Sequence, residues 1–199
     1  MQRSLKSTHL PSIVGALVPR STTWVNLAVD AALIVGFAAL TGLMAQVAIY
    51  VNPAVPITGQ TFAVLLAGAV LGGKKGSASM AVYLVMGVLG IPVFAPTGAI
   101  PGASRGYFLG FIAAAAIVGY LCERGWARNP FKLTVAMLIG EVAIYTGGLS
   151  WLAFYVPADK VLPWGLYDFV VGDVIKLVMA ALAVPLTWVG IGKLRSGDA

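Results

Sequence analysis

The sequence predicts an all-α integral membrane protein with six transmembrane helices and both termini in the cytoplasm. The first observation is composition: 59% of the 199 residues are hydrophobic and 10% are charged, whereas a soluble domain carries roughly 25% charged residues. The second is that the hydrophobic residues form long unbroken runs, which argue against a β-barrel because barrel strands alternate in segments of about ten residues. The third is an uneven distribution of basic residues between the two sides of these runs, which sets the orientation of a membrane protein.

Six apolar runs, separated by polar, basic or proline-rich segments, are the predicted spans. They occupy residues 24–51, 62–71, 77–90, 107–121, 133–156 and 164–191. At a rise of about 1.5 Å per residue the first run is long enough to cross a bilayer, whereas the second and third are short and predict tilted or half-buried helices. We therefore expect a cytoplasmic tail at residues 1–23, a membrane domain at residues 24–191 and a second cytoplasmic tail at residues 192–199.

The first run carries small residues at four-residue spacing, which lets another helix approach closely. These residues are Ala28, Ala32 and Gly36. Two interpretations remain open: packing within this bundle, or a docking surface for another subunit.

Two irregular segments interrupt the helical pattern. Residues 52–61 contain Pro53, Pro56 and Gly59, and residues 91–106 contain three prolines and three glycines, which a regular helix does not accommodate. Irregular backbone at membrane depth survives where it lines a cavity or is covered by protein. The first segment is therefore a candidate cavity wall, and the second is a long loop of the kind that often serves as a lid.

The lysines and arginines divide unevenly when they are counted on alternate sides of the six spans. Ten fall on one side: Arg3, Lys6, Arg20, Lys74, Lys75, Arg124, Arg128, Lys132, Lys193 and Arg195. Two fall on the other side, Arg105 and Lys160, and Lys176 lies within a span. Because the positive side faces the cytoplasm, the two irregular segments are predicted to lie outside.

An acid and a base lie inside the last apolar run. Asp173 and Lys176 are three residues apart, so a helix places them on one face. Charges at membrane depth are costly and usually face a bundle interior, a partner or a ligand. We interpret the pair as the floor of a binding site, with a buried ion pair that binds no ligand as the alternative.

Further donors, acceptors and aromatic rings are predicted on the outer half of the bundle, near this pair. They are Thr58, Gln60, Phe94, Arg105, Tyr107 and Tyr145. Such a set suits a small ligand with a carboxylate and a polar ring, since arginine binds carboxylates with two parallel hydrogen bonds, aspartate accepts from ring N–H groups and lysine donates to a carbonyl. The alternative for Arg105 is an interfacial anchor, and for Tyr145 it is core packing.

The sequence offers no catalytic or metal-binding pattern. Cys122 is the single cysteine and His9 the single histidine, which leaves no disulfide framework and no set of metal ligands. The glycines before Lys74 lack the spacing of a phosphate-binding loop. We expect no cofactor and no nucleic-acid partner. Two alternatives stay open beside a substrate-capturing subunit: a small membrane enzyme that uses Asp173 and Lys176 as acid and base, and an autonomous small-solute carrier.

Four segments, taken in order, resemble the BioY family of biotin-binding S components of energy-coupling-factor (ECF) transporters. The matching segments are VPITGQT at 55–61, LGIPVF at 89–94, GYFLGF at 106–111 and GDVIK at 172–176. The resemblance implies a six-helix S-component fold in the cell membrane, with biotin as the transported ligand near the outer face.

The resemblance also implies roles and partners. It implies that Gln60 and Arg105 contact the carboxylate of biotin, that Asp173 and Lys176 contact its ureido ring, and that residues 91–106 form the lid. The implied partners are a transmembrane coupling subunit and two ATPases, with the small residues of the first span as the docking face.

Overall fold

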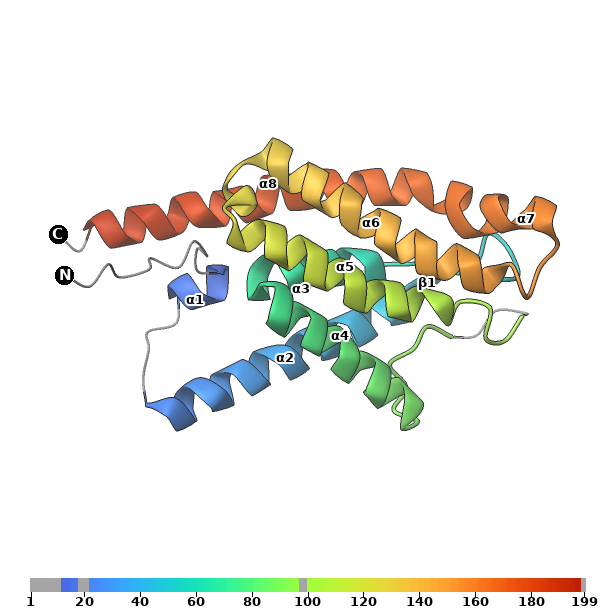
Figure 1. Ribbon diagram of the computed structural model, residues 1–199, viewed down its shortest axis with the longest axis horizontal. Coiled ribbons are helices and arrows are strands. Elements are labelled where there is room, and N and C mark those ends of the chain that lie inside the picture. Colours follow the sequence, from blue (N-terminus) through green and yellow to red (C-terminus); the bar gives the residue numbers. More distant parts are fainter. Residues whose placement is uncertain (1–11, 18–21, 97–99, 198–199) are drawn as a thin grey trace, which may run out of the picture.

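The computed structural model describes residues 12–17, 22–96 and 100–197, and from residue 188 onward it describes the backbone alone. The described chain is a bundle of helices with one small β-hairpin (Figure 1). The elements are α1 (Ile13–Leu17), α2 (Thr23–Gln46), β1 (Ala48–Ile49), β2 (Ile57–Thr58), α3 (Gln60–Leu71), α4 (Gly73–Val88), α5 (Gly106–Glu123), a 3₁₀ turn (Trp126–Arg128), α6 (Pro130–Leu152), α7 (Ala158–Leu162), a π turn (Pro163–Tyr167) and α8 (Asp168–Gly197).

Within the described residues, four helical stretches are long and apolar enough to cross a membrane: α2, α5, α6 and the stretch 158–187, which includes most of α8. This confirms the predicted class of an all-α membrane protein. At about 1.5 Å per residue, α3 is about 18 Å long and α4 about 24 Å, which is less than the ~30 Å hydrocarbon core. The count of six spans, the limits of the two tails and the side on which each terminus lies stay predictions.

The centre of the bundle is built on close helix contacts at glycine. A Cβ added to Gly68 of α3 would lie 2.6 Å from the carbonyl oxygen of Ala115 in α5. A Cβ added to Gly110 of α5 would lie 2.7 Å from the Cα of Ile144 in α6. Because any side chain would push these backbones apart, the glycines allow α3, α5 and α6 to approach closely.

The connection between α3 and α4 is shorter than the predicted turn at residues 72–76. It is the single residue Gly72, whose φ of +84° favours glycine. Lys74 and Lys75 lie in the first turn of α4, and the ammonium group of Lys75 pairs with Asp30 of α2. The corner therefore also joins α4 to α2.

The segment between α2 and α3 is irregular, as predicted, but it has internal order. α2 ends at Gln46 rather than at Val51, and β1 and β2 pair antiparallel with Ala48 opposite Thr58. Asn52 accepts hydrogen bonds from the backbone N–H groups of Ala54 and Val55, each at 2.9 Å. Its amide donates to Asp168 of α8 at 2.8 Å, which anchors this segment to the last helix.

The connections of the bundle alternate between its two ends. In Figure 1, α1, the connection between α5 and α6, and the C-terminal end of α8 lie at one end, and α7 lies at the other. Arg124, Arg128 and Lys132 belong to the first of these ends, and the pair Asp159 and Lys160 to the second. The basic connection between α5 and α6 therefore lies at the opposite end of the bundle from Asp159 and Lys160.

Candidate functional site

A cavity of about 550 Å³ lies between α3, α5, α6 and the two irregular segments. Six of the predicted site residues line it: Thr58, Gln60, Phe94, Arg105, Tyr107 and Tyr145. They come from four separate stretches of the chain, at residues 58–60, 94, 105–107 and 145, and the fold brings them to one place. Residues 97–99 of the predicted lid lie outside the described residues.

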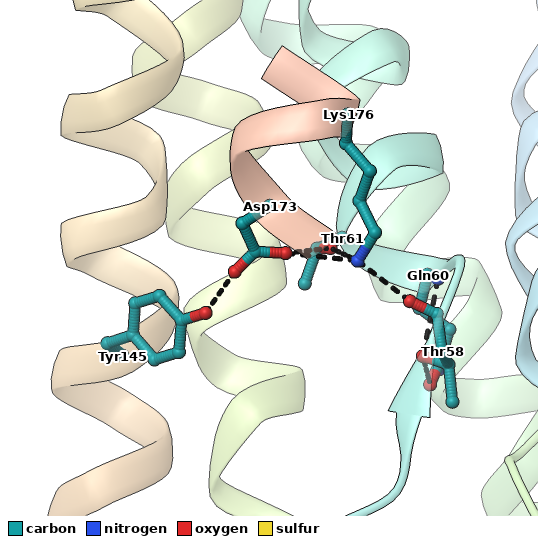
Figure 2. A network of polar contacts seen from close by, with 6 residues as sticks. All are labelled: Thr58, Gln60, Thr61, Tyr145, Asp173 and Lys176. Carbon is teal, nitrogen blue, oxygen red and sulfur yellow. Dashed lines mark hydrogen bonds and ion pairs between the residues drawn. The ribbon is translucent and has the colours of Figure 1, made fainter. Parts of the chain in front are cut away.

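Asp173 and Lys176 form an ion pair on α8, with 3.0 Å between Oδ1 and Nζ (Figure 2). The ammonium group also donates to the carbonyl oxygen of Thr58 at 2.9 Å and to Oγ1 of Thr61 at 2.8 Å. The hydroxyl of Thr61 donates to Oδ1 of Asp173 at 3.3 Å, and the hydroxyl of Tyr145 donates to Oδ2. The pair is therefore tied to α3, to β2 and to α6.

The network satisfies the lysine completely and the aspartate incompletely. An ammonium group has three donors, and Asp173, Thr61 and Thr58 accept all three. A carboxylate oxygen has two lone pairs; Oδ1 accepts from Lys176 and Thr61, whereas Oδ2 accepts from Tyr145 alone. One acceptor position on Oδ2 is thus available for a further N–H donor.

The ion pair lies behind the cavity wall and does not form the wall itself. The side chain of Asp173 is 8% exposed and that of Lys176 is 16% exposed, and neither residue lines the cavity. Thr58, Thr61 and Tyr145 line it and contact the pair directly. A ligand would reach Asp173 by moving between these three side chains.

Gln60 begins α3 and is buried at the inner side of the cavity. Its amide nitrogen donates to the hydroxyl of Tyr83 at 2.5 Å, and its amide oxygen accepts from the hydroxyl of Thr58 at 2.9 Å. Both polar ends of the amide are thus held by protein, which fixes the orientation of Gln60.

Aromatic rings form the apolar wall. The ring of Phe94 stacks on Phe108 with centroids 4.4 Å apart, and it meets Tyr83 edge-on at 5.5 Å. A Cβ on Gly87 of α4 would lie 2.1 Å from the Phe94 ring, so the ring can pack here because residue 87 has no side chain. The predicted loop residue Phe94 therefore closes one side of the cavity.

Arg105 and Tyr107 stand on either side of the start of α5 and have different surroundings. Arg105 is exposed and lines the cavity, and its side chain has no hydrogen-bond or ion-pair partner within the described part of the chain. Tyr107 is buried, and its hydroxyl donates to the carbonyl oxygen of Gly165 at 2.7 Å. The guanidinium of Arg105 is therefore available to an anion, whereas the hydroxyl of Tyr107 holds the π turn before α8.

Two residues of the site were not predicted from the sequence. Thr61 bridges Lys176 and Asp173, and Tyr83 holds Gln60. Thr61 follows Gln60 directly, so its position beside a predicted contact was a usable signal. Tyr83 had no comparable signal, because it lies in an apolar run 23 residues from its partner.

Glu141 lies four residues before Tyr145 on α6 and is buried. Neither of its carboxyl oxygens has a hydrogen-bond partner among the described residues.

The described residues contain no group of three or more His, Cys, Asp and Glu side chains placed to hold a metal ion. The arrangement is suited to binding a small molecule with N–H donors at one end and an anionic group at the other.

The small residues of α2 lie away from the cavity. Ala28, Ala32 and Gly36 are all exposed, and a Cβ added to Gly36 would meet no atom within 4 Å. In Figure 1, α2 runs along the side of the bundle opposite α6 and α8. This face is thus not used for packing against the rest of the described chain.

Two relatives are similar in sequence to this protein over most of its length. The "Probable biotin transporter BioY" of Pyrococcus horikoshii is 38% identical over 157 residues, which is 77% of this chain and 92% of that protein. The "Biotin transporter BioY" of Thermotoga maritima is 40% identical over 152 residues, 73% of this chain and 88% of that protein.

A solved structure has the same fold. It is described as the S-component for biotin from an ECF-type ABC transporter, and it matches with a TM-score of 0.70. The match covers 88% of this chain and 95% of that chain at 24% sequence identity. A family model described as "BioY family" matches residues 16–193. With 178 of 199 residues inside that match and two named relatives near 40% identity, the chain belongs to the BioY family.

Proposed function

We propose that this chain is the membrane subunit that captures biotin from outside the cell for ATP-driven uptake by an ECF-type transporter. The observation that carries the proposal is a cavity with two different polar ends. The guanidinium of Arg105, which has no partner among the described residues, lines the cavity, and the buried Asp173–Lys176 pair lies behind the wall formed by Thr58, Thr61 and Tyr145. Biotin has the matching chemistry, because it carries a carboxylate on a flexible chain and a neutral ureido ring with two N–H groups and a carbonyl. A cavity of about 550 Å³ falls within the usual range of about 300–1,000 Å³ for small-molecule sites.

The ureido ring is assigned to the end formed by Thr58, Thr61 and Tyr145. There a ring N–H donates to the remaining lone pair of Asp173 Oδ2. The ring carbonyl faces Lys176, whose ammonium group exchanges one of its internal acceptors for the ligand. The two fused rings lie against the aromatic wall of Phe94 and Phe108, which supplies apolar contact area.

The carboxylate is assigned to Arg105. An arginine without an internal partner forms two parallel charge-assisted hydrogen bonds with a carboxylate at little internal cost. Gln60 is the second predicted contact for the carboxylate. The bonds from Gln60 to Tyr83 and Thr58 support a different role, in which it orients Thr58 beside the ring.

The partners in the proposed complex are a transmembrane coupling subunit and two ATPases. The exposed face of Ala28, Ala32 and Gly36 on α2 is assigned to the coupling subunit, since small residues favour close helix contacts in a bilayer. Two observations support this occupant: the face has no packing partner among the described residues, and the structural neighbour is described as the S-component from an ECF-type ABC transporter. Ala32→Leu is expected to reduce copurification of the coupling subunit.

The proposed location is the cell membrane, with the cavity and the segments 52–61 and 91–106 facing outside. The charge count and the alternation of the connections support this orientation. A cysteine placed at Asp159 should react with a membrane-impermeant thiol reagent in intact cells, and one placed at Arg128 should not.

The two alternatives from the sequence have different outcomes. The relatives are described as biotin transporters, which favours transport over an enzyme that uses Asp173 and Lys176 as acid and base. An autonomous carrier predicts biotin accumulation in liposomes that contain this chain alone. The ECF proposal predicts accumulation when the coupling subunit, the ATPases and ATP are present.

The direct test is calorimetric titration of biotin into the purified subunit in detergent. The proposal predicts saturable binding of one biotin per chain and a large loss of affinity in Lys176→Ala. Absence of binding by a folded parent protein would refute the biotin assignment, and other vitamins with a carboxylate would then be titrated against the same pair of proteins.

A further inference from the structure

Helix α2 contacts the start of the lid along one stripe of its surface. The residues of this stripe are four apart: Ala38, Gly42 and Gln46, followed by Tyr50 just after β1. Ala38 is fully buried and Gly42 is buried. Gly36 and Ala38 are two residues apart and therefore about 200° apart around the axis, whereas Gln46 lies five turns after Ala28 and in line with it.

The contacts between this stripe and residues 92–96 follow the order of both segments. A Cβ added to Gly42 would lie 2.9 Å from the Cβ of Val93, so the lid backbone lies directly on this glycine. The amide nitrogen of Gln46 donates to the carbonyl oxygens of Pro92 and Phe94, at 3.3 and 3.2 Å.

Two further contacts complete the set. The hydroxyl of Tyr50 donates to the carbonyl oxygen of Pro96 at 2.5 Å, and the amide nitrogen of Gln46 also lies 3.1 Å from the carbonyl oxygen of Gly42. Phe94 sits between these anchor points and lines the cavity. The carbonyl groups of Pro92, Phe94 and Pro96 are thus held by side chains that belong to α2 or follow it directly.

We propose that Gly42, Gln46 and Tyr50 form a latch that holds residues 92–96 closed over the cavity, so that α2 controls the escape of the ligand. The proposal rests on the proposed function for the identity of the ligand. The hydrogen bonds of the latch lie at the exposed surface, where water can replace them when they break. The latch therefore opens without leaving buried polar groups unsatisfied.

The position of the latch gives α2 two functions at two places along its length. The exposed small residues Ala28, Ala32 and Gly36 lie in its first half, and Gly42 and Gln46 hold the lid near its C-terminal end. A partner that tilts or shifts α2 would move Gln46 and Tyr50 away from the lid carbonyls and release Phe94 from the cavity. Docking and ligand release would then be linked through one helix.

The first experiment measures how fast bound tritiated biotin leaves the purified subunit after an excess of unlabelled biotin is added. Gln46→Leu removes the two donors and is expected to speed release roughly tenfold, and Tyr50→Phe roughly threefold. Thr187→Val is the matched control, because it removes an exposed hydroxyl that bonds only to its own helix, at the carbonyl oxygen of Ala183. Release from Gln46→Leu at the control rate would overturn the latch.

The second experiment closes the latch covalently. Cysteines at Gly42 and Val93 need only about 1 Å of additional separation to reach the ~3.8 Å between Cβ atoms of a disulfide. Oxidation of the pair is expected to slow biotin release at least tenfold, and reduction is expected to restore it. The single variant Gly42→Cys controls for the native Cys122. Equal release from the oxidised and reduced pair would contradict the proposal.

A third measurement separates failure of the latch from failure of the biotin assignment, because it needs no ligand. The extent of disulfide formation by the Gly42/Val93 cysteine pair is measured with and without Gln46→Leu. A latch predicts less cross-linking in the Gln46→Leu background, since the lid then spends more time away from α2. Equal cross-linking would refute the latch even in a protein that binds no biotin.

Discussion

The two charged parts of the site are prepared for a ligand in opposite ways. At the inner end, behind the cavity wall, Asp173 and Lys176 are buried, paired and held by Thr58, Thr61 and Tyr145. At the outer end, Arg105 is exposed, and its guanidinium has no partner in the described chain. The inner charges must be neutralised before any ligand arrives, because isolated charges at membrane depth are costly. The charge of Arg105 is exposed to solvent and needs no protein counter-ion in the absence of a ligand.

This difference separates stability from binding. A change at the inner end removes part of the folded structure as well as a ligand contact. A change at the outer end removes a ligand contact alone. Substitutions at the two ends should therefore give different combinations of affinity and thermal stability.

Asp173→Asn is expected to have the largest effect on both quantities. It leaves the Lys176 ammonium buried without its counter-ion, and breaking a buried ion pair in this way costs about 3–5 kcal/mol of unfolding free energy. It also removes the anionic acceptor for the ring N–H. We expect a large fall in thermal unfolding temperature and a loss of biotin affinity beyond a hundredfold, measured by scanning calorimetry and titration.

The matched control for this substitution is Asp159→Asn. Asp159 also pairs with a lysine, Lys160, at 3.6 Å, but its side chain is 71% exposed, and such surface pairs contribute about 0–1 kcal/mol. Comparable destabilisation by the two substitutions would contradict the idea that burial makes the inner pair structural.

Arg105→Ala should produce the complementary result. Hydrogen bonds to charged groups are worth about 1.5–3 kcal/mol, so biotin affinity should fall roughly tenfold to hundredfold. The unfolding temperature of the ligand-free protein should not change, since Arg105 has no partner in the described chain. Arg105→Lys keeps the charge but loses the two-pronged geometry, and its affinity should lie between those of Arg105→Ala and the parent. A loss of ligand-free stability in Arg105→Ala would show that the outer end is structural too.

Tyr145→Phe is expected to have a smaller effect. It removes the donor that orients Oδ2 of Asp173 and leaves the ion pair intact. The affinity for biotin should fall several-fold to about tenfold, with a modest change in stability. Tyr167→Phe is a suitable control, because Tyr167 is 58% exposed. Equal affinities of Tyr145→Phe and the parent would mean that the hydroxyl does not position the carboxylate for the ligand.

The sequence could predict the helical membrane class and the charges of the site, because both depend on local information. Asp173 and Lys176 are three residues apart on one helix, so their proximity follows from helix geometry. Their contacts with Thr61 depend on how α3 packs against α8, across 112 and 115 residues of chain. The residues around Thr61 in the sequence do not predict how α3 packs against α8.

The loops show the same limit. Prolines and glycines predicted that residues 52–61 and 91–106 are irregular, because these residues do not fit a regular helix. The order inside these segments comes from distant side chains, such as Asn52 bonding to Asp168 and Gln46 bonding to the lid. The position of the ion pair relative to the cavity surface also could not be predicted from the sequence. It lies behind Thr58, Thr61 and Tyr145 rather than on the cavity surface, because three acceptors draw the ammonium group inward.

The most direct test of the two-ended site compares biotin with its neutral amide, biotinamide, in the parent, Arg105→Ala and Asp173→Asn proteins by calorimetric titration. The amide keeps the ureido ring and loses the negative charge. The account predicts that Arg105→Ala weakens biotin much more than biotinamide, whereas Asp173→Asn weakens both ligands to a similar degree. If Arg105→Ala weakened both ligands equally, or if Asp173→Asn spared the amide, the assignment of the carboxylate to the outer end and the ring to the inner end would be wrong.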